Sequence, residues 1–290
     1  METLPTKVAP GELRESQKAA LLNLLADEDP TVHAAVRSKI LSLGPLTRQW
    51  LRPHALSSDP LLRRRTQELI LHFDRQAADN AFLGFCLRNG EDFDMEEGAW
   101  LLARTQYPDI NIEAYQALLD SFVAELKQLT AHYQRANQIL GQVNEYLFNE
   151  LSFTGNEQNY YDPENSFMNR VLDRRTGNPI NLCLFYILIA RRLHLPVVGV
   201  GLPGHFICRY QSSSDEIYID VFNHGRQLTK ADCVQHLVRG NYDLDDDYLS
   251  PVSPRRMFQR ICRNLHQIYL QLEMSEPATR FQRYLVALGK

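Results

Sequence analysis

Apolar residues recur at helical spacing along residues 16–88, which predicts that this part of the chain is helical. The dipeptide Asp-Pro occurs twice in this stretch, at Asp29-Pro30 and at Asp59-Pro60. An aspartate can cap the first N–H groups of a helix, and a proline fits the first helical position. The apolar residues that follow the two copies match in position. This similarity favours HEAT-like helical hairpins, and two similarly capped helices in an ordinary bundle are the alternative.

The same spacing continues to residue 140 and returns at the end of the chain. It predicts a helical region over residues 16–140 and a helical hairpin over residues 251–290. Ser253-Pro254 is a helix start of the same kind as the Asp-Pro pairs, and the final hairpin has tetratricopeptide-like character. Residues 1–15 are polar and interrupted by proline and glycine, so we expect a loose tail there.

A helix that is apolar on almost every side is predicted to begin at Pro179. Asn178 is a good N-cap residue, and Pro179 suits the first helical position. The residues up to Leu193 leave no polar face except in the last turn, and Leu195-Pro196 ends the helix. A helix with this pattern is normally buried in a core.

Three strand-like segments follow this helix, at residues 197–200, 205–210 and 216–222. The last two are joined by a short polar tip that contains three consecutive serines. If the tip is symmetric about its first two serines, His205 lies directly opposite Asp220, with the two side chains on the same face. The pattern therefore predicts a His–Asp contact in an antiparallel sheet.

Together these segments predict an α+β fold. A mostly helical region (16–140) precedes a core with a small antiparallel sheet (141–250), and a helical hairpin (251–290) closes the chain.

The composition is that of a globular protein, with 44% hydrophobic and 23% charged residues among 290. The net charge of −4 and the absence of a basic block argue against a nucleic-acid binder. No apolar run has the length of a signal peptide core at the start or of a membrane span elsewhere. The five cysteines form no CxxC pair, which favours reduced thiols. We therefore expect a cytoplasmic protein that binds neither nucleic acid nor membrane.

Cys183, His205 and Asp220 supply the residue types of a thiol catalytic triad. A thiol nucleophile is activated by a helix N-terminus and an adjacent imidazole, and the imidazole is oriented by an acid. Cys183, however, lies four residues after Pro179, beyond the first turn, and its neighbours are apolar. The alternative role for Cys183 is that of a small buried core residue, and for the His–Asp pair that of a structural hydrogen bond.

No metal or cofactor is predicted. A zinc site could be imagined from His205, Cys208, Cys233 and His236, but His205 and Cys208 are three apart on a strand and point to opposite faces. The acidic run 243–247 lacks the ordered ligand pattern of a calcium loop. The chain also has no glycine-rich phosphate-binding motif.

Six separate motifs occur in order over residues ~90–290. They are Asn144-Glu145-Tyr146-Leu147-Phe148, Phe153-Thr154-Gly155-Asn156, Tyr161-Asp162-Pro163-Glu164-Asn165-Ser166, Val171-Leu172-Asp173-Arg174-Arg175-Thr176-Gly177-Asn178-Pro179-Ile180, Pro203-Gly204-His205-Phe206 and Asp220-Val221-Phe222-Asn223. Together they resemble a bacterial family of transglutaminase-like proteins with a tetratricopeptide-like C-terminal tail. A related segment occurs in a eukaryotic F-box protein.

The resemblance implies a papain-like core in which one buried helix packs on an antiparallel sheet. In active transglutaminase-like enzymes the nucleophilic cysteine follows a glycine at the start of that helix. Here Gly177 is followed by Asn178-Pro179, which has no thiol. His205 and Asp220 correspond to the other two members of the triad.

Two functions therefore remain open. The favoured one is a non-catalytic protein that binds a protein, peptide or small ligand in a cleft lined by Asn178, Asn181, Tyr160, Asn165 and His205. The alternative is a thiol-dependent hydrolase or acyltransferase that uses Cys183 with the His–Asp pair. A purely structural helical adaptor is the third, and it leaves the Pro-Gly-His-Phe motif unexplained.

Overall fold

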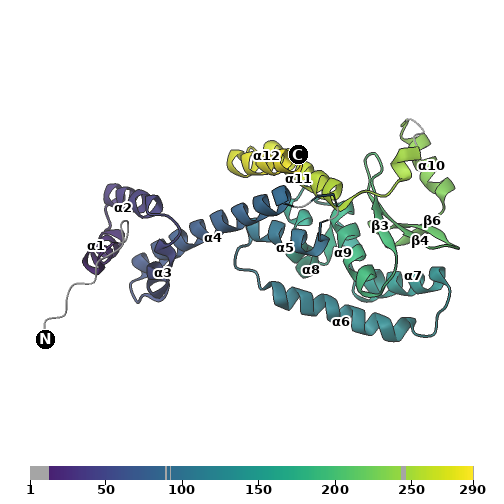
Figure 1. The fold of residues 1–290 in the computed structure, drawn as a ribbon, viewed down its shortest axis with the longest axis horizontal. Coiled ribbons are helices and arrows are strands. Elements are labelled where there is room, and N and C mark those ends of the chain that lie inside the picture. Colours follow the sequence, from purple (N-terminus) through teal and green to yellow (C-terminus); the bar gives the residue numbers. More distant parts are fainter. Residues whose placement is uncertain (1–12, 89, 92, 243–245, 290) are drawn as a thin grey trace. The chain divides into compact units, whose positions relative to one another are not determined.

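The computed structural model describes residues 13–88, 90–91, 93–242 and 246–289, and its contacts divide the chain into two compact units at Asp79 (Figure 1). The boundaries that the sequence suggests at residues 140 and 250 stay predictions. Most of the predicted N-terminal tail and part of the acidic run 243–247 lie outside the described residues.

The first unit is helical, as predicted for residues 16–88. Its elements are α1 (Glu15–Leu25), α2 (Pro30–Ser42), α3 (Thr47–Leu51), the short 3₁₀ helix η1 (Arg52–Leu56) and the first part of α4 (Pro60–Arg88). Asp29 accepts a hydrogen bond from the Thr31 N–H at 2.7 Å, and Asp59 accepts one from the Leu61 N–H at 2.8 Å. Each Asp-Pro pair thus begins a helix as expected. The HEAT-like arrangement stays a prediction.

The second unit contains helices and two small sheets. Its helices are α5 (Met95–Gln106), α6 (Ile112–Thr130), α7 (Ala136–Asn144), η2 (Glu145–Glu150), η3 (Pro163–Ser166), α8 (Met168–Arg174), α9 (Pro179–Arg192), α10 (Lys230–Arg239), η4 (Asp246–Leu249), α11 (Pro254–Gln271) and α12 (Ser275–Leu288). Strands β1 (Thr154–Gly155) and β2 (Thr176–Gly177) pair in parallel. Strands β3 (Val197–Val200), β4 (Ile207–Gln211), β5 (Glu216–Asp220) and β6 (Arg226–Leu228) form an antiparallel sheet in that order.

Helix α9 is the centre of this unit, which confirms the prediction of a buried helix. Asn178 caps it by accepting a hydrogen bond from the Asn181 N–H at 3.0 Å. Every residue from Pro179 to Ala190 is buried. The helix contacts β3 and β4 on one side and α5, α6, α8 and α11 elsewhere (Figure 1).

The register of the β4–β5 hairpin differs from the predicted one by two residues. Gln211 pairs with Glu216, so the tip is centred between the last two serines rather than the first two. The Ser212 hydroxyl accepts the Asp215 N–H at 3.0 Å, and this side-chain bond fixes a loop that strand symmetry cannot predict. Because the error is an even number of residues, the predicted faces of the strands are retained.

The C-terminal hairpin packs into the same core as the rest of the second unit. Buried residues of one cluster run from Phe82 to Leu288, and they include Phe258 of α11 and Tyr284 of α12. This shared core is why contacts do not separate residues 251–290 from the sheet region. The tetratricopeptide-like character of the hairpin stays a prediction. None of the helices in the described part of the chain is both long and apolar enough to span a membrane.

Candidate functional site

His205 and Asp220 meet at one end of the antiparallel sheet. His205 follows Gly204, whose positive φ of 72° turns the chain three residues before β4 begins. Asp220 is the last residue of β5. His205 Nε2 lies 2.9 Å from Asp220 Oδ1, so the predicted His–Asp contact is present despite the shifted register.

The Asp220 carboxylate is fixed from a second side. Its Oδ2 accepts a hydrogen bond from Asn223 Nδ2 at 2.8 Å. Burial alone raises the pKa of Asp220, but the hydrogen bonds from His205 and Asn223 outweigh burial, and the pKa is lowered from its usual value. The side chains of His205 and Asp220 are 15% and 12% exposed, so the pair remains reachable from solvent.

Aromatic and cationic groups surround the imidazole. The rings of Phe222 and His236 lie 6.1 Å and 5.9 Å from the His205 ring, measured between centroids. From α11, Arg260 Nη2 donates to the carbonyl oxygens of Leu202 at 2.9 Å and of His205 at 2.7 Å. These two bonds hold the loop that presents the imidazole.

Cys183 lies in the core. It is 0% exposed, and its Sγ donates to the Phe206 carbonyl oxygen at 3.5 Å. The Sγ of Cys208 in turn donates to the Cys183 carbonyl oxygen at 3.7 Å. Burial is the main cause that raises the pKa of the Cys183 thiol well above its usual value, and the neighbouring Cys208 adds to this effect. Both features favour the protonated thiol, whereas a nucleophile needs the thiolate.

We expect iodoacetamide to leave all five cysteines of the folded protein unmodified near neutral pH, because all five are buried. Burial raises the pKa of Cys86 and of Cys233 to about 12, so these thiols are also protonated. Mass spectrometry of each cysteine before and after unfolding in guanidinium measures this. Rapid labelling of Cys183 that is lost in His205→Ala would contradict the expectation and indicate an active thiol–imidazole pair.

The predicted ligand-binding asparagines are largely occupied by internal hydrogen bonds. Asn178 accepts from Asn181 Nδ2 and donates to Ser166 Oγ, each at 2.9 Å. The fully buried Asn165 donates to the Asn159 carbonyl at 2.8 Å and accepts from Asn156 Nδ2 at 2.9 Å. These amides shape the 156–165 loop from within.

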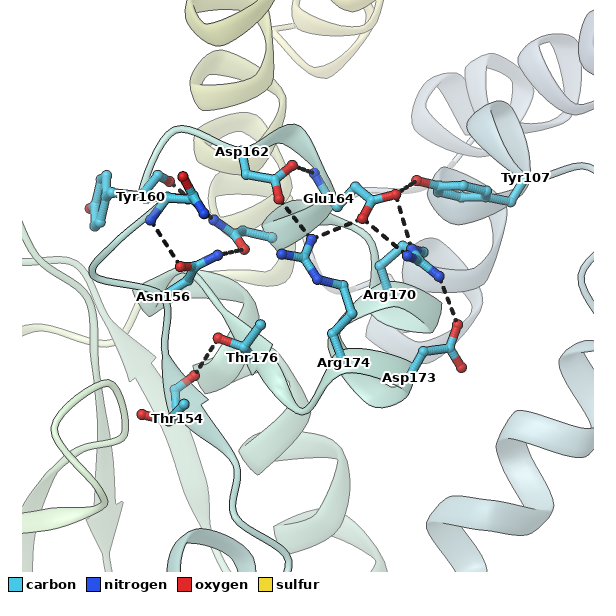
Figure 2. Close-up of polar contacts among 12 residues, drawn as sticks. Tyr107, Thr154, Asn156, Tyr160, Asp162, Glu164, Arg170, Asp173, Arg174 and Thr176 are labelled. Carbon is cyan, nitrogen blue, oxygen red and sulfur yellow. Dashed lines mark hydrogen bonds and ion pairs between the residues drawn. The ribbon is translucent and has the colours of Figure 1, made fainter.

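An ion-pair network fixes the outer side of the same loop (Figure 2). Arg174 pairs with Asp162 at 2.7 Å and with Glu164 at 2.9 Å, and Arg170 pairs with Glu164 at 3.1 Å. The hydrogen bond from Arg170 is the main reason why the pKa of Glu164 is lowered. Residue types alone did not reveal this network, although its members lie within two short segments of the sequence.

A pocket of about 90 Å³ lies between the 156–165 loop and α11. It is lined by Tyr160, Tyr161, Asn178, Asn264, Gln267, Ile268 and Gln271. Tyr160 and Asn178 were predicted from the sequence, whereas Asn165 and Asn181 are not among the lining residues. The α11 residues were missed, because the helical spacing of their three carboxamides is also that of an ordinary solvated helix face.

The pocket is connected to the His–Asp pair through Phe222. The Phe222 ring lies 6.1 Å from the ring of Tyr160 on one side and 6.1 Å from the ring of His205 on the other. In the described part of the chain, no three His, Cys, Asp or Glu side chains are grouped as metal ligands. The site thus combines the imidazole of His205, which Asp220 orients, with a pocket lined by uncharged hydrogen-bonding side chains.

A buried helix packed on an antiparallel sheet, with His and Asp at the sheet's end, defines a transglutaminase-like class of protein. A family model described as the transglutaminase-like superfamily matches residues 113–263, more than half of the chain, and the chain belongs to this superfamily. It is 36% identical over 197 residues to a UPF0162 protein of Xylella fastidiosa (strain 9a5c), covering 66% of this chain and 70% of that protein.

Two further relatives extend the comparison. A UPF0162 protein of Pseudomonas aeruginosa is 29% identical over 210 residues, covering 70% of this chain and 75% of that protein. Human F-box only protein 21 is 30% identical over 231 residues, covering 68% of this chain but only 36% of that protein. No solved structure matches the chain.

Proposed function

We propose that this chain is a non-catalytic transglutaminase-like protein that binds a peptide segment of a partner protein in the pocket beside His205. The observation that carries the proposal is the placement of Cys183. Its thiol is fully buried and donates to a backbone carbonyl, so it offers neither access nor a thiolate for attack.

The start of α9 supports the same conclusion. In active relatives of this fold the nucleophile uses the unpaired N–H groups and positive end of the helix. Here the Asn178 side chain accepts the Asn181 N–H, and Pro179 has no N–H to offer. The position that a nucleophile would occupy is thus used to cap the helix.

The pocket supports binding by its chemistry. The three carboxamides that α11 contributes can each donate and accept hydrogen bonds, whereas Asn178 is engaged within the fold. The two tyrosines add aromatic surface. Peptide groups need both kinds of partner, so this lining suits an extended peptide. The similarity to F-box only protein 21 is compatible with a role in protein–protein interaction, which we propose here for this chain.

A displayed library of random peptides tests this function on the full chain. Gln267→Trp fills the pocket from an exposed position on α11, and Gln128→Trp places the same residue on the exposed face of α6. We expect selection on the wild type to enrich peptides that bind the Gln128→Trp control but lose at least about tenfold in affinity on Gln267→Trp. Enrichment of no peptide, or equal binding to both variants, would refute the proposal.

The alternative function is a thiol-dependent hydrolase or acyltransferase. The observation that favours it is the His205–Asp220 hydrogen bond at 2.9 Å, which orients an imidazole as catalysis requires. That function also needs Cys183 to become accessible, and the alkylation experiment above decides between the two.

A further inference from the structure

Helix α11, which forms one wall of the pocket, carries cations without any acidic residue. Its sequence contains four arginines and no aspartate or glutamate, although the whole chain has a net charge of −4. Arg255 is buried, whereas Arg256 and Arg263 are exposed and Arg260 is half-buried. The charge on this helix is therefore opposite to that of the molecule as a whole.

Arg260 is held in place but keeps its charge uncompensated. Among the described residues, only Nη2 of its guanidinium forms hydrogen bonds, to the carbonyl oxygens of Leu202 and His205. The group lies 5.4 Å from the centre of the Phe206 ring. Within the described residues no carboxylate pairs with Arg260. Nε and Nη1 thus remain as donors of a partly desolvated cation, where a charge-assisted hydrogen bond is strongest.

Arg260 adjoins the pocket at the end nearest His205. It precedes Asn264, which lines the pocket, by one helical turn. Tyr160, on the opposite wall, feels the charge: burial raises the pKa of the Tyr160 phenol, and Arg260 acts in the opposite direction. The guanidinium of Arg260 and the phenol of Tyr160 are therefore close enough to interact electrostatically.

The acidic residues nearest to the pocket in the sequence do not compete for Arg260. Asp162 and Glu164 are paired with Arg174 and Arg170 on the outer side of the loop (Figure 2). These two carboxylates are therefore engaged by other arginines, and an anionic group on an occupant of the pocket would meet an arginine that no described carboxylate pairs with.

We propose that the peptide taken by this pocket carries a carboxylate and that Arg260 binds it. This inference rests on the proposed function and names the ligand class for the same site. From Arg260 to Gln271 the helix rises ~16 Å, which is the length of about five extended residues. A carboxylate on Arg260 therefore places the neighbouring peptide groups along the carboxamides of Asn264, Gln267 and Gln271.

The peptides selected from the library test this inference after resynthesis. Each is made in its original form, with Asp and Glu changed to Asn and Gln, and with its C-terminal carboxylate changed to an amide. Affinities are measured by fluorescence anisotropy on wild type, Arg260→Gln, Arg260→Lys and Lys127→Gln. The last variant removes an exposed cation from α6 and serves as the control for net charge.

We expect Arg260→Gln to lower the affinity for the original peptides at least about tenfold and the affinity for their neutralised forms less than about twofold. A direct charge pair gives this difference in a double-mutant cycle, because the substitution matters only while the carboxylate is present. Lys127→Gln changes neither, and Arg260→Lys recovers part of the loss. The source of the carboxylate is identified on the wild type, by whether affinity is lost in the Asn/Gln form or in the C-terminal amide form. A side-chain carboxylate and a C-terminal carboxylate both support the inference.

Equal losses for original and neutralised peptides on Arg260→Gln would overturn the inference. Arg260 would then only position the His205 loop, while peptide binding itself would stand. The inference would also be overturned if every neutralised peptide bound the wild type as tightly as its original form. This comparison uses only the wild-type protein, so it does not depend on the folding of a variant. Failure of the proposed function is recognised separately, because the selected peptides would then bind Gln267→Trp as tightly as the Gln128→Trp control.

Discussion

Replacing Arg255 with methionine is expected to lower the free energy of unfolding of the second unit by about 3–5 kcal/mol. The side chain is 7% exposed and donates from Nε to the Leu288 carbonyl at 2.9 Å, from Nη1 to the Cys86 carbonyl at 3.0 Å and from Nη2 to the Ala287 carbonyl at 2.9 Å. These oxygens belong to the last turns of α4 and α12, where helices leave carbonyls unpaired and partially negative. Methionine fills the space but leaves all of them without this donor.

Guanidinium denaturation measures the loss. Trp50 lies in the first unit and Trp100 in the second, so a Trp50→Phe background assigns the fluorescence change to the second unit. Arg256→Met is the matched control, because Arg256 is adjacent in sequence but exposed, and we expect it to change stability by less than about 0.5 kcal/mol. Equal effects of the two substitutions would show that the loss of stability comes from the charge on α11 rather than from capping of the two helix ends.

Local signals predicted the helices well because caps and proline act within one turn. Asp29 and Asp59 each bond to the N–H two residues further on, and Asn178 bonds to the Asn181 N–H. The burial of α9 could also be predicted from the sequence, since a helix without a polar face is unstable on a protein surface. These features depend on neighbours in the sequence and on little else.

The hairpin register depended on a contact that composition does not reveal. The tip contains three serines in a row, and either centre of symmetry fits the sequence. The Ser212 side chain selects one of them through its bond to the Asp215 N–H. The His–Asp contact survived the error because the shift preserved the face and because His205 lies before the strand, where the chain can bend toward Asp220.

The pocket could not be predicted, because its two walls are about a hundred residues apart and meet only through packing in the core. The carboxamides of α11 have the spacing of an ordinary solvated helix face, and nothing in the sequence places Tyr160 opposite them. Burial of Cys183, by contrast, followed from its apolar neighbours. The sequence therefore reported which candidate is inaccessible more reliably than it reported where a ligand binds.

Gly225→Ala is expected to cost about 2–4 kcal/mol, through packing rather than through backbone preference alone. Gly225 has a φ of 69°, and a Cβ placed there would lie 2.5 Å from Asn144 Cγ and 2.5 Å from Phe148 Cε2. Asn144 cannot move aside easily, because it donates to the Gly225 carbonyl and accepts from the Tyr186 hydroxyl at 2.9 Å. The turn that ends at this glycine holds Asp220, so the strain also reaches the His–Asp pair.

Gly204→Ala separates the two contributions within the same unit. Gly204 has a similar φ of 72°, but the nearest atom to its added Cβ is the Tyr242 hydroxyl at 3.3 Å, the far end of a side chain that is 40% exposed. Backbone preference alone then costs about 1 kcal/mol. Denaturation followed by Trp100 compares the two variants. If Gly225→Ala lowered the free energy of unfolding no more than Gly204→Ala, the side chains of Asn144 and Phe148 would have to move aside for the added methyl group. The turn that follows Asp220 would then be packed less rigidly than its contacts imply.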